Sequence, residues 1–227
     1  ITMVYRKMDD VPPEELTQLG IMEISDNGRV MDLREKPHNP DSNIASLGIY
    51  ILKRTLLIEL LEESLTHGGY DFVIDVLIRK LYTLRIFGYE FSGYWRCLTS
   101  VLSYYRCNME MLEPERLYDL FNRNGKIYTK VKDETPAKYN EEANVTNSIV
   151  ADGCIIEGTV VNSVLFRGVT IEKNTYIKDS ILMQGTRVCE NAQLFNVITD
   201  KNVVISRDKQ LRGDSSWPVI VGKNVTV

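Results

Sequence analysis

The sequence has few of the residues that build metal centres or disulfide frameworks. Its 227 residues include two histidines and four cysteines, and no two cysteines form a Cys-x-x-Cys pair, so the common zinc sites are not expected. No apolar run reaches the roughly 20 residues that span a bilayer, and no secretory signal opens the printed sequence. A formal net charge of −4 argues against nucleic acid or an anionic membrane as the main partner. We therefore expect a cytoplasmic protein with reduced thiols and no metal of its own.

The chain begins without a start methionine and already in a strand-like pattern, so we expect a piece of a longer protein. Its first part mixes strand and helix signals, which indicates an α/β sheet. The expected elements are a hairpin around 26–28, a buried strand at 45–53, helices at 55–65, 72–81 and 99–112, and a strand at 84–95. Asp26-Asn27-Gly28 is a strong hairpin signal, and Thr99 or Ser100 is the expected cap of the third helix. A connector with a short helical candidate at 115–121 follows.

The last third of the chain is repetitive. Ile149, Ile155 and Val161 are six residues apart. Further aliphatic residues return at near-hexad intervals, namely Val169, Ile171, Ile177, Val188 and Leu194. Scattered glycines, including Gly153 and Gly168, fall between them. The spacing favours a β-helix in which one apolar residue of each short strand points inward and small residues turn the corners. An irregular β-sandwich of short strands is the alternative.

Several ordered segments carry a resemblance to a known family. They are GIMEISDNGRVMDLREKP, NIASLGIYIL, YDFVIDVL, GYWRCLTSVLSYYRCNMEML, GCIIEGTVVNSVLFRGVTI and NVITDKNVVI. Together they resemble ADP-glucose pyrophosphorylase, the glucose-1-phosphate adenylyltransferase family. The resemblance implies the C-terminal half of an α/β nucleotidyltransferase domain (GT-A/Rossmann-like) at 1–112, a connector at 113–140, and a left-handed parallel β-helix of hexapeptide repeats at 141–227. The family's glycine-rich phosphate loop is missing, which implies that the nucleotide half is missing too.

The resemblance also implies a sugar-phosphate site. Glu35 would accept hydrogen bonds from the sugar, and Lys36, held extended by the following proline, would bind the phosphate as a point charge. A Glu-Lys-Pro sequence is otherwise an ordinary solvated loop. Ser46 would contact the glucose ring, or it is simply a small residue in a strand.

Two more residues belong to this implied site. Asp71 would accept sugar hydroxyls, or it caps the following helix; Val73 replaces a glycine of the family here. Trp95 would pack on the sugar, or it fills the core.

Cys97 is the main departure from the family. Active members have Gly-Tyr-Trp-Arg-Asp where this chain has Gly-Tyr-Trp-Arg-Cys. That aspartate helps to hold the Mg²⁺ that offsets charge between the sugar phosphate and the α-phosphate of ATP. A thiol is a poor ligand for this hard cation, so we expect no catalytic residue here and no cofactor bound by this chain, with Mg²⁺ serving the holoenzyme.

The resemblance therefore favours a GlgD-type subunit, the non-catalytic regulatory partner of a catalytic ADP-glucose pyrophosphorylase subunit in glycogen synthesis. Its expected partners are that subunit, in a hetero-oligomer (a tetramer) or homo-oligomer, and sugar phosphates, with no nucleic acid and no membrane. One alternative is an active adenylyltransferase subunit that tolerates Cys97. Another is a hexapeptide-repeat acyltransferase or assembly module, although no histidine lies beyond Tyr139.

Overall fold

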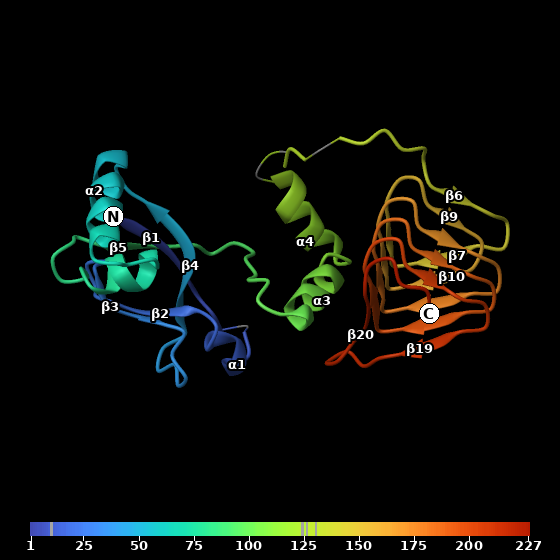
Figure 1. Cartoon of the computed structure of the whole chain (residues 1–227), viewed down its shortest axis with the longest axis horizontal. Coiled ribbons are helices and arrows are strands. Elements are labelled where there is room, and N and C mark those ends of the chain that lie inside the picture. The colour runs from blue at the N-terminus through green and yellow to red at the C-terminus, as the bar shows by residue number, and fades with distance from the viewer. Residues whose placement is uncertain (10, 124, 126, 130) are drawn as a thin grey trace. The chain divides into compact units, whose positions relative to one another are not determined.

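The computed structural model describes residues 1–9, 11–123, 125, 127–129 and 131–227. The chain divides into two compact units, Ile1–Gly93 and Tyr94–Val227 (Figure 1). Each unit has a hydrophobic core of its own. Within the described residues, no helix has both the length and the apolar character needed to cross a membrane.

The first unit is built on a five-stranded mixed sheet with the strand order β3-β2-β4-β1-β5. The strands are β1 (Thr2–Lys7), β2 (Gly20–Ile24), β3 (Val30–Glu35), β4 (Ile44–Ile51) and β5 (Phe87–Glu90). All neighbours pair antiparallel except β1 and β5, which are parallel. The helices are α1 (Pro13–Leu16), α2 (Arg54–Thr66) and the π-helical segment η1 (Phe72–Ile78).

The hairpin predicted for the first unit from its turn residues is confirmed. β2 and β3 form the expected hairpin, and Gly28 turns it with a φ of 81°, a conformation that glycine adopts without steric cost. One core cluster lies between the sheet and η1; its buried members are Met3, Met22, Val30, Leu33, Leu77, Leu81 and Ile86. Helical segments stand between strands in the chain, as expected: α1 follows β1, and α2 and η1 lie between β4 and β5.

The expected strand at 84–95 is shorter than predicted. β5 covers only Phe87–Glu90, because its parallel pairing with β1 ends where Tyr5 meets Glu90. Residues 92–95 form neither helix nor strand.

The second unit begins with helices and continues as stacked coils. Its helices are α3 (Val101–Glu110), α4 (Pro114–Tyr118) and the π-helical segment η2 (Asp119–Arg123). Ser100 caps α3 as expected: the Ser103 N–H donates to Ser100 Oγ at 3.0 Å, and the Ser100 N–H donates to Ser103 Oγ at 2.9 Å. This reciprocal pair satisfies donors that the first turn of a helix leaves open.

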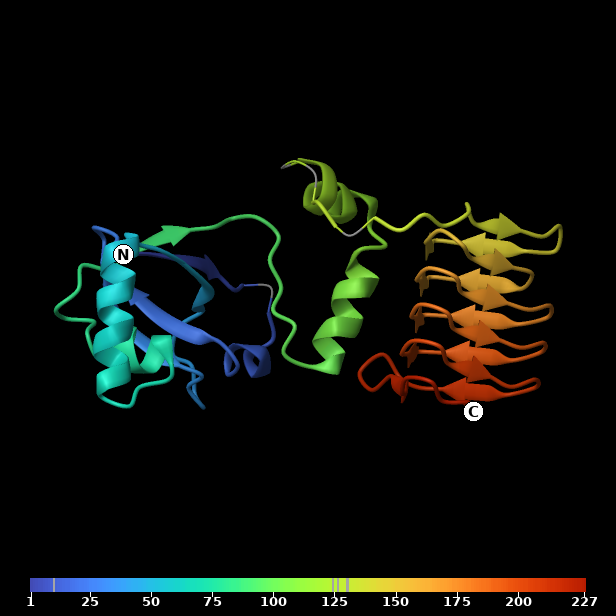
Figure 2. The same cartoon turned by 45° about the horizontal axis from the view of Figure 1, so that its top comes forward.

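The coils form a parallel β-helix, which Figure 2 shows from the side. One sheet contains β7 (Asn144–Thr146), β10 (Thr159–Val161), β13 (Tyr176–Lys178), β16 (Gln193–Phe195) and β19 (Gln210–Arg212). A second contains β8 (Ile149–Val150), β11 (Val164–Leu165), β14 (Ile181–Leu182), β17 (Val197–Thr199) and β20 (Val219–Val221). The third contains β6 (Lys138–Tyr139), β9 (Ile155–Ile156), β12 (Thr170–Ile171), β15 (Arg187–Val188) and β18 (Val204–Ile205).

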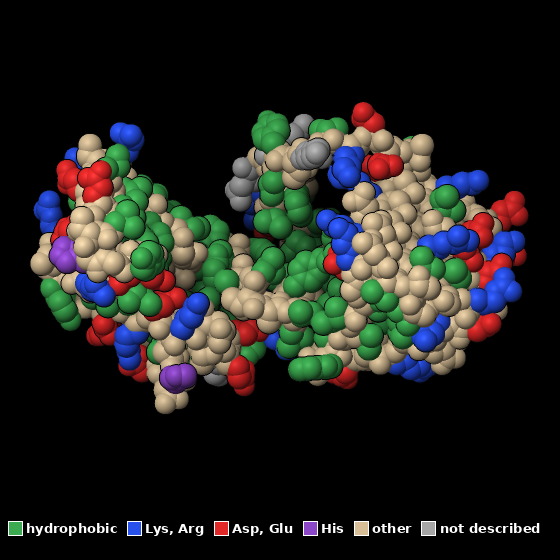
Figure 3. Space-filling model, in the orientation of Figure 1, with side chains coloured by type: hydrophobic (Ala, Val, Ile, Leu, Met, Phe, Trp, Pro, Cys, Tyr) green, Lys and Arg blue, Asp and Glu red, His purple; other side chains and the backbone are tan. Residues whose placement is uncertain are grey.

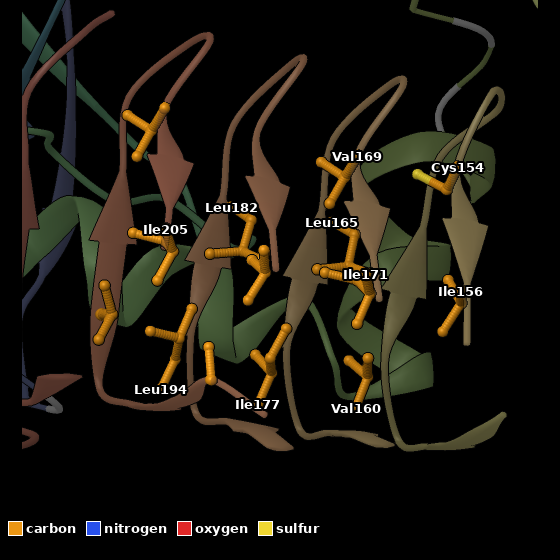
Figure 4. Packing of buried hydrophobic residues seen from close by; sticks show 14 of the residues in the cluster. Cys154, Ile156, Val160, Leu165, Val169, Ile171, Ile177, Leu182, Leu194 and Ile205 are labelled. Carbon is orange, nitrogen blue, oxygen red and sulfur yellow. The ribbon is translucent and has the colours of Figure 1, made fainter. Parts of the chain in front are cut away.

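Most coils repeat every 17 residues, so equivalent side chains stack directly. Val160, Ile177, Leu194 and Leu211 follow one another in register along one sheet. Figure 4 shows such residues pointing into the interior of the coils. Because a strand of two or three residues cannot bury a core alone, the coils are stable only as a stack.

The phase of the first predicted hexads was wrong. Ile149, Ile155 and Val161 lie outside the core cluster, and Ile155 is 43% exposed, whereas its neighbour Ile156 is fully buried. Each of these strands carries two aliphatic residues in a row, so composition alone does not reveal which one points inward. The later positions, including Ile171, Ile177 and Leu194, are fully buried as expected.

The corners depend on asparagine and aspartate more than on the predicted glycines. Residues with a positive φ at the corners include Asn147, Asn162, Asp179 and Asn196, and these residue types adopt that conformation most readily after glycine. Asn147 Nδ2 donates to Asn162 Oδ1 at 2.8 Å, and Asn162 Nδ2 donates to Asp179 Oδ1. The side chains therefore form a polar ladder that links one coil to the next.

Candidate functional site

Glu35 stands at the end of β3 in a space left by a glycine on β2. Gly20 pairs with Glu35 across the hairpin. A Cβ at Gly20 would lie 3.0 Å from Glu35 Oε2 and 3.6 Å from the Cβ of Ser46. Gly20 therefore leaves room for the carboxylate beside Ser46.

Lys36 does not have the extended backbone that was expected before a proline. Its φ is 46°, in the left-handed region that side chains other than those of asparagine, aspartate and glycine seldom occupy. The reason is local: the Lys36 N–H donates to the Leu19 carbonyl at 3.1 Å, which completes the hairpin ladder, and the chain then leaves the sheet abruptly. The Lys36 ammonium is 3.9 Å from Glu35 Oε1 and its side chain is 59% exposed.

Four side chains of the first unit share one electrostatic environment. Burial raises the pKa of Glu35, Lys36 opposes the rise, and the negative charge of Asp71 adds to it. Burial also raises the pKa of Tyr50, a hydrogen bond with Ser46 opposes this, and Glu35 and Asp71 raise it further. Glu35 and Asp71 thus act on the same neighbour, Tyr50, and Ser46 bonds Tyr50.

Asp71 acts as the cap of η1. Its Oδ1 accepts hydrogen bonds from the backbone N–H groups of Val73 and Ile74, both at 2.8 Å. The capping alternative is therefore observed. Contact between Asp71 and a sugar stays a prediction, because capping through Oδ1 leaves open whether Oδ2 accepts other donors.

The group has the chemistry of a polyol phosphate site. Partly buried carboxylates such as Glu35 accept hydrogen bonds from hydroxyl groups, and the exposed Lys36 supplies a cation for a phosphate. Sequence reasoning missed Gly20 and Tyr50, because their roles depend on strand pairing and on packing. Tyr50 is four residues from Ser46 on β4, but the register of the strand shifts between them, so simple alternation does not point to Tyr50.

Trp95 and Cys97 belong to the second unit, in the irregular segment that precedes α3. Trp95 is half-buried and lines an apolar groove of about 350 Å³ with Tyr94, Leu98 and Met111, among others. Cys97 is half-buried and is not part of a disulfide. Trp95 therefore lines a groove and is not among the residues of the core clusters in the described part of the chain, and a role with sugar stays a prediction.

A cluster around Glu110, at the end of α3, holds this segment. The Arg96 guanidinium donates to both carboxylate oxygens of Glu110, with Nε–Oε2 at 3.1 Å and Nη2–Oε1 at 3.2 Å. Tyr94 donates its hydroxyl proton to Glu110 Oε2 at 2.8 Å, and Arg116 Nη1 is 3.4 Å from the same oxygen. Burial and the Glu110 carboxylate raise the pKa of Tyr94. This cluster was not predicted from the sequence.

The residues around Cys97 do not fit a magnesium ion. Mg²⁺ takes oxygen ligands, usually carboxylates and water, and position 97 offers a thiol. In the part of the chain that the structure describes, no three His, Cys, Asp or Glu side chains gather closely enough to hold a metal ion. Both histidines, His38 and His67, are exposed on the first unit (Figure 3).

Comparison with known proteins also finds two regions, of which the first extends beyond Gly93 and includes α3. Residues 7–114 match the family described as Nucleotidyl transferase, and residues 133–216 match the family described as GlmU-like, C-terminal hexapeptide. The chain therefore combines a nucleotidyltransferase domain with a hexapeptide-repeat region folded as a parallel β-helix, as the sequence predicts.

Individual relatives carry a more specific name. A protein called glucose-1-phosphate adenylyltransferase from Bacillus mycoides (strain KBAB4) is 35% identical over 215 residues, which is 93% of this chain. A protein of the same name from Bacillus anthracis is 34% identical over the same length. The chain spans 57% of the length of each of these relatives.

Proposed function

We propose that this chain is part of a non-catalytic, regulatory subunit of ADP-glucose pyrophosphorylase, of the GlgD type. The reaction of the holoenzyme would convert ATP and glucose 1-phosphate to ADP-glucose and pyrophosphate, with Mg²⁺, in glycogen synthesis. The observation that carries the proposal is Cys97, which stands where the resembled family has an aspartate. The 35% identity to proteins named for this reaction supports the choice of family.

The chemistry of a thiol explains why the site would be inactive. A cysteine has an ordinary pKa near 8.5 and is mostly uncharged at neutral pH, and its sulfur is a soft ligand for a hard cation. Removal of one electrostatic element from an active site costs about 100-fold or more in rate. A subunit with this loss contributes through its contacts with a catalytic partner, by shifting that partner between less and more active states.

The group around Glu35 supports retention of ligand binding in such a subunit. Glu35, Ser46 and Lys36 supply the acceptors and the cation that a sugar phosphate requires, and none of these roles needs the metal. The proposed subunit would therefore bind glucose 1-phosphate, or a similar sugar phosphate, without turning it over. Its proposed setting is a hetero-oligomer, such as a tetramer, in the cytoplasm.

The competing proposal is a catalytically active adenylyltransferase subunit. The relatives favour it, because the proteins from Bacillus mycoides and Bacillus anthracis are both named glucose-1-phosphate adenylyltransferase. It requires that the reaction tolerate a thiol at position 97.

Pyrophosphate release from ATP and glucose 1-phosphate separates the two. We would measure it for the full-length protein, alone and with its catalytic partner, as wild type and as Cys97→Asp. A regulatory subunit is silent alone, alters the kinetics of the partner, and gains at least about tenfold activity with aspartate if the metal site is the only defect. High activity of the wild type alone would refute the regulatory proposal and leave the catalytic one.

A further inference from the structure

The helix α3 connects two parts of the second unit that are far apart in the sequence. At one end of the connection is the Cys97 segment, and at the other is the polar ladder of the β-helix corners. Both contacts are made by side chains of the same helix, at Glu110 and at Tyr105.

Tyr105 fixes α3 to the coils. Its ring is 4% exposed and packs with Val164, Ile181 and Ile198, which lie on three successive strands of one sheet. Its hydroxyl donates to the Asp179 carbonyl oxygen at 2.8 Å and lies 2.9 Å from Asn196 Oδ1. Burial and nearby carboxylates raise the pKa of Tyr105 to about 12, so it stays a neutral donor at physiological pH.

Glu110 fixes the other end. Its two oxygens are shared by Arg96, Arg116 and the Tyr94 hydroxyl, and the side chains of Arg96 and Glu110 are only 18% and 23% exposed. Both guanidinium groups also lie over the Tyr94 ring, at 5.4 and 5.8 Å from its centre. Without the carboxylate, the bonds that join Arg96, Arg116 and the Tyr94 hydroxyl at one acceptor would be lost, and Glu113 would still pair with Arg116.

We propose that Glu110 is a positioning residue that latches the Cys97 segment to α3, and that α3 relays the state of the β-helix to that segment. Arg96 is the direct neighbour of Cys97 in the chain, so a fixed guanidinium fixes the backbone on which the thiol sits. The relay rests on the proposed regulatory function, because it gives contacts made by the β-helix a physical route to the position where the family has its metal ligand. The latch itself does not depend on that function.

Glu110→Gln is the direct test of the latch, because glutamine keeps the shape and removes the charge. The readout is the alkylation rate of Cys97 in the full-length protein, located by peptide mass spectrometry, with Cys189 of the β-helix as internal reference. We expect Cys97 to react about tenfold faster and Cys189 to be unchanged, since loss of a charge-assisted hydrogen bond shifts a local equilibrium by about that factor.

Glu113→Gln is the matched control. Glu113 lies three residues away and pairs with Arg116, whereas Arg96 pairs with Glu110, so the same change of charge at Glu113 should leave Cys97 alkylation at the wild-type rate. If Glu110→Gln gives no faster alkylation, or Glu113→Gln gives the same increase, the latch is wrong. Should Glu110→Gln fail to fold by circular dichroism, Tyr94→Phe removes a single bond of the cluster and should give a smaller increase in the same direction.

The relay has a separate test with the catalytic partner. Tyr105→Phe removes the hydroxyl contacts to the coils and leaves the latch intact, so it should reduce the effect on partner kinetics without changing Cys97 alkylation, whereas Glu110→Gln should change both. Wild-type-like regulation by both variants would overturn the relay. If the wild type has no effect on the partner, the regulatory function fails, and the alkylation results still decide the latch.

Discussion

The two units solve the problem of buried polar groups in opposite ways. In the β-helix, the fully buried polar side chains are neutral hydroxyls, such as those of Ser163, Ser180 and Thr186. Each bonds the adjoining coil: Ser163 Oγ accepts from the Ser180 N–H, and Ser180 Oγ accepts from the Val197 N–H, both at 3.1 Å. In the first unit, an ionisable carboxylate, Glu35, is partly buried beside a second one, Asp71.

The two units therefore differ in the kind of polar group that each one buries. The satisfied neutral hydroxyls link the coils through bonds that do not depend on ionisation. Perturbed titratable groups are typical of binding and catalytic sites. The pair Glu35 and Asp71 thus gives the first unit a feature of a ligand site, and the neutral hydroxyls give the β-helix a feature of a support.

The largest expected effect tests the rigid support. Ile177→Ala removes a fully buried side chain from the middle of the stack and should destabilise the β-helix by about 3 kcal/mol, from lost transfer energy and the cavity left behind. Ile155→Ala, at a 43% exposed position, should cost less than about 1 kcal/mol. Urea unfolding of both variants measures the difference. Equal costs would mean that the inward and outward phases of the coils are wrongly assigned.

A smaller effect on the free energy of unfolding is expected when glycine replaces Asn162 or Lys36. Asn162 and Lys36 have similar φ values, 48° and 46°, but Asn162 takes part in the ladder. Asn162→Gly keeps the backbone and loses the side-chain bonds, at about 1 kcal/mol. Lys36→Gly relieves a left-handed lysine, which costs roughly 1–2 kcal/mol, so it should be neutral or stabilising in urea unfolding.

Lys36→Gly should at the same time weaken binding of glucose 1-phosphate, measured by calorimetry. Backbone strain that persists at a residue with an exposed cation is typical of a functional position. A glycine variant that is more stable and still binds the sugar phosphate as well as the wild type would remove Lys36 from the site.

How much the sequence predicts depends on the distance over which each feature is decided. The turn at Gly28 and the cap at Ser100 are set by residues within four positions, and both were predicted. The inward phase at Ile156 was missed, because two-residue strands are too short to show alternation. The neighbours of Glu35 were found only in part: Gly20 is opposite it across a hairpin, and Tyr50 comes from another strand.

The cluster at Glu110 was missed for the same reason. Arg96 and Glu110 are 14 residues apart, and each is an ordinary charged residue in its local context. Only the fold of the segment back onto α3 shows that they pair. Residue roles that come from the family resemblance, such as those of Ser46 and Trp95 with a sugar, remain predictions.

The smallest expected effect concerns the titration of Glu35. Its pKa is raised above its ordinary value of 4.5, so the folded state binds this proton more strongly than the unfolded state. Glu35 should therefore contribute stability that is lost as the pH rises from that value through the raised one. Its slope is opposite in sign to that of Asp41 and Asp75, whose pKa values are lowered by hydrogen bonds, and the neutral hydroxyls of the coils contribute no slope. Carbon-13 NMR of the Glu35 carboxyl measures the titration directly.

Asp71→Asn keeps a capping side chain and removes the like charge, so it should lower the pKa of Glu35. An unchanged titration would show that the two carboxylates do not share one site, and the contrast between the units would then rest on burial alone.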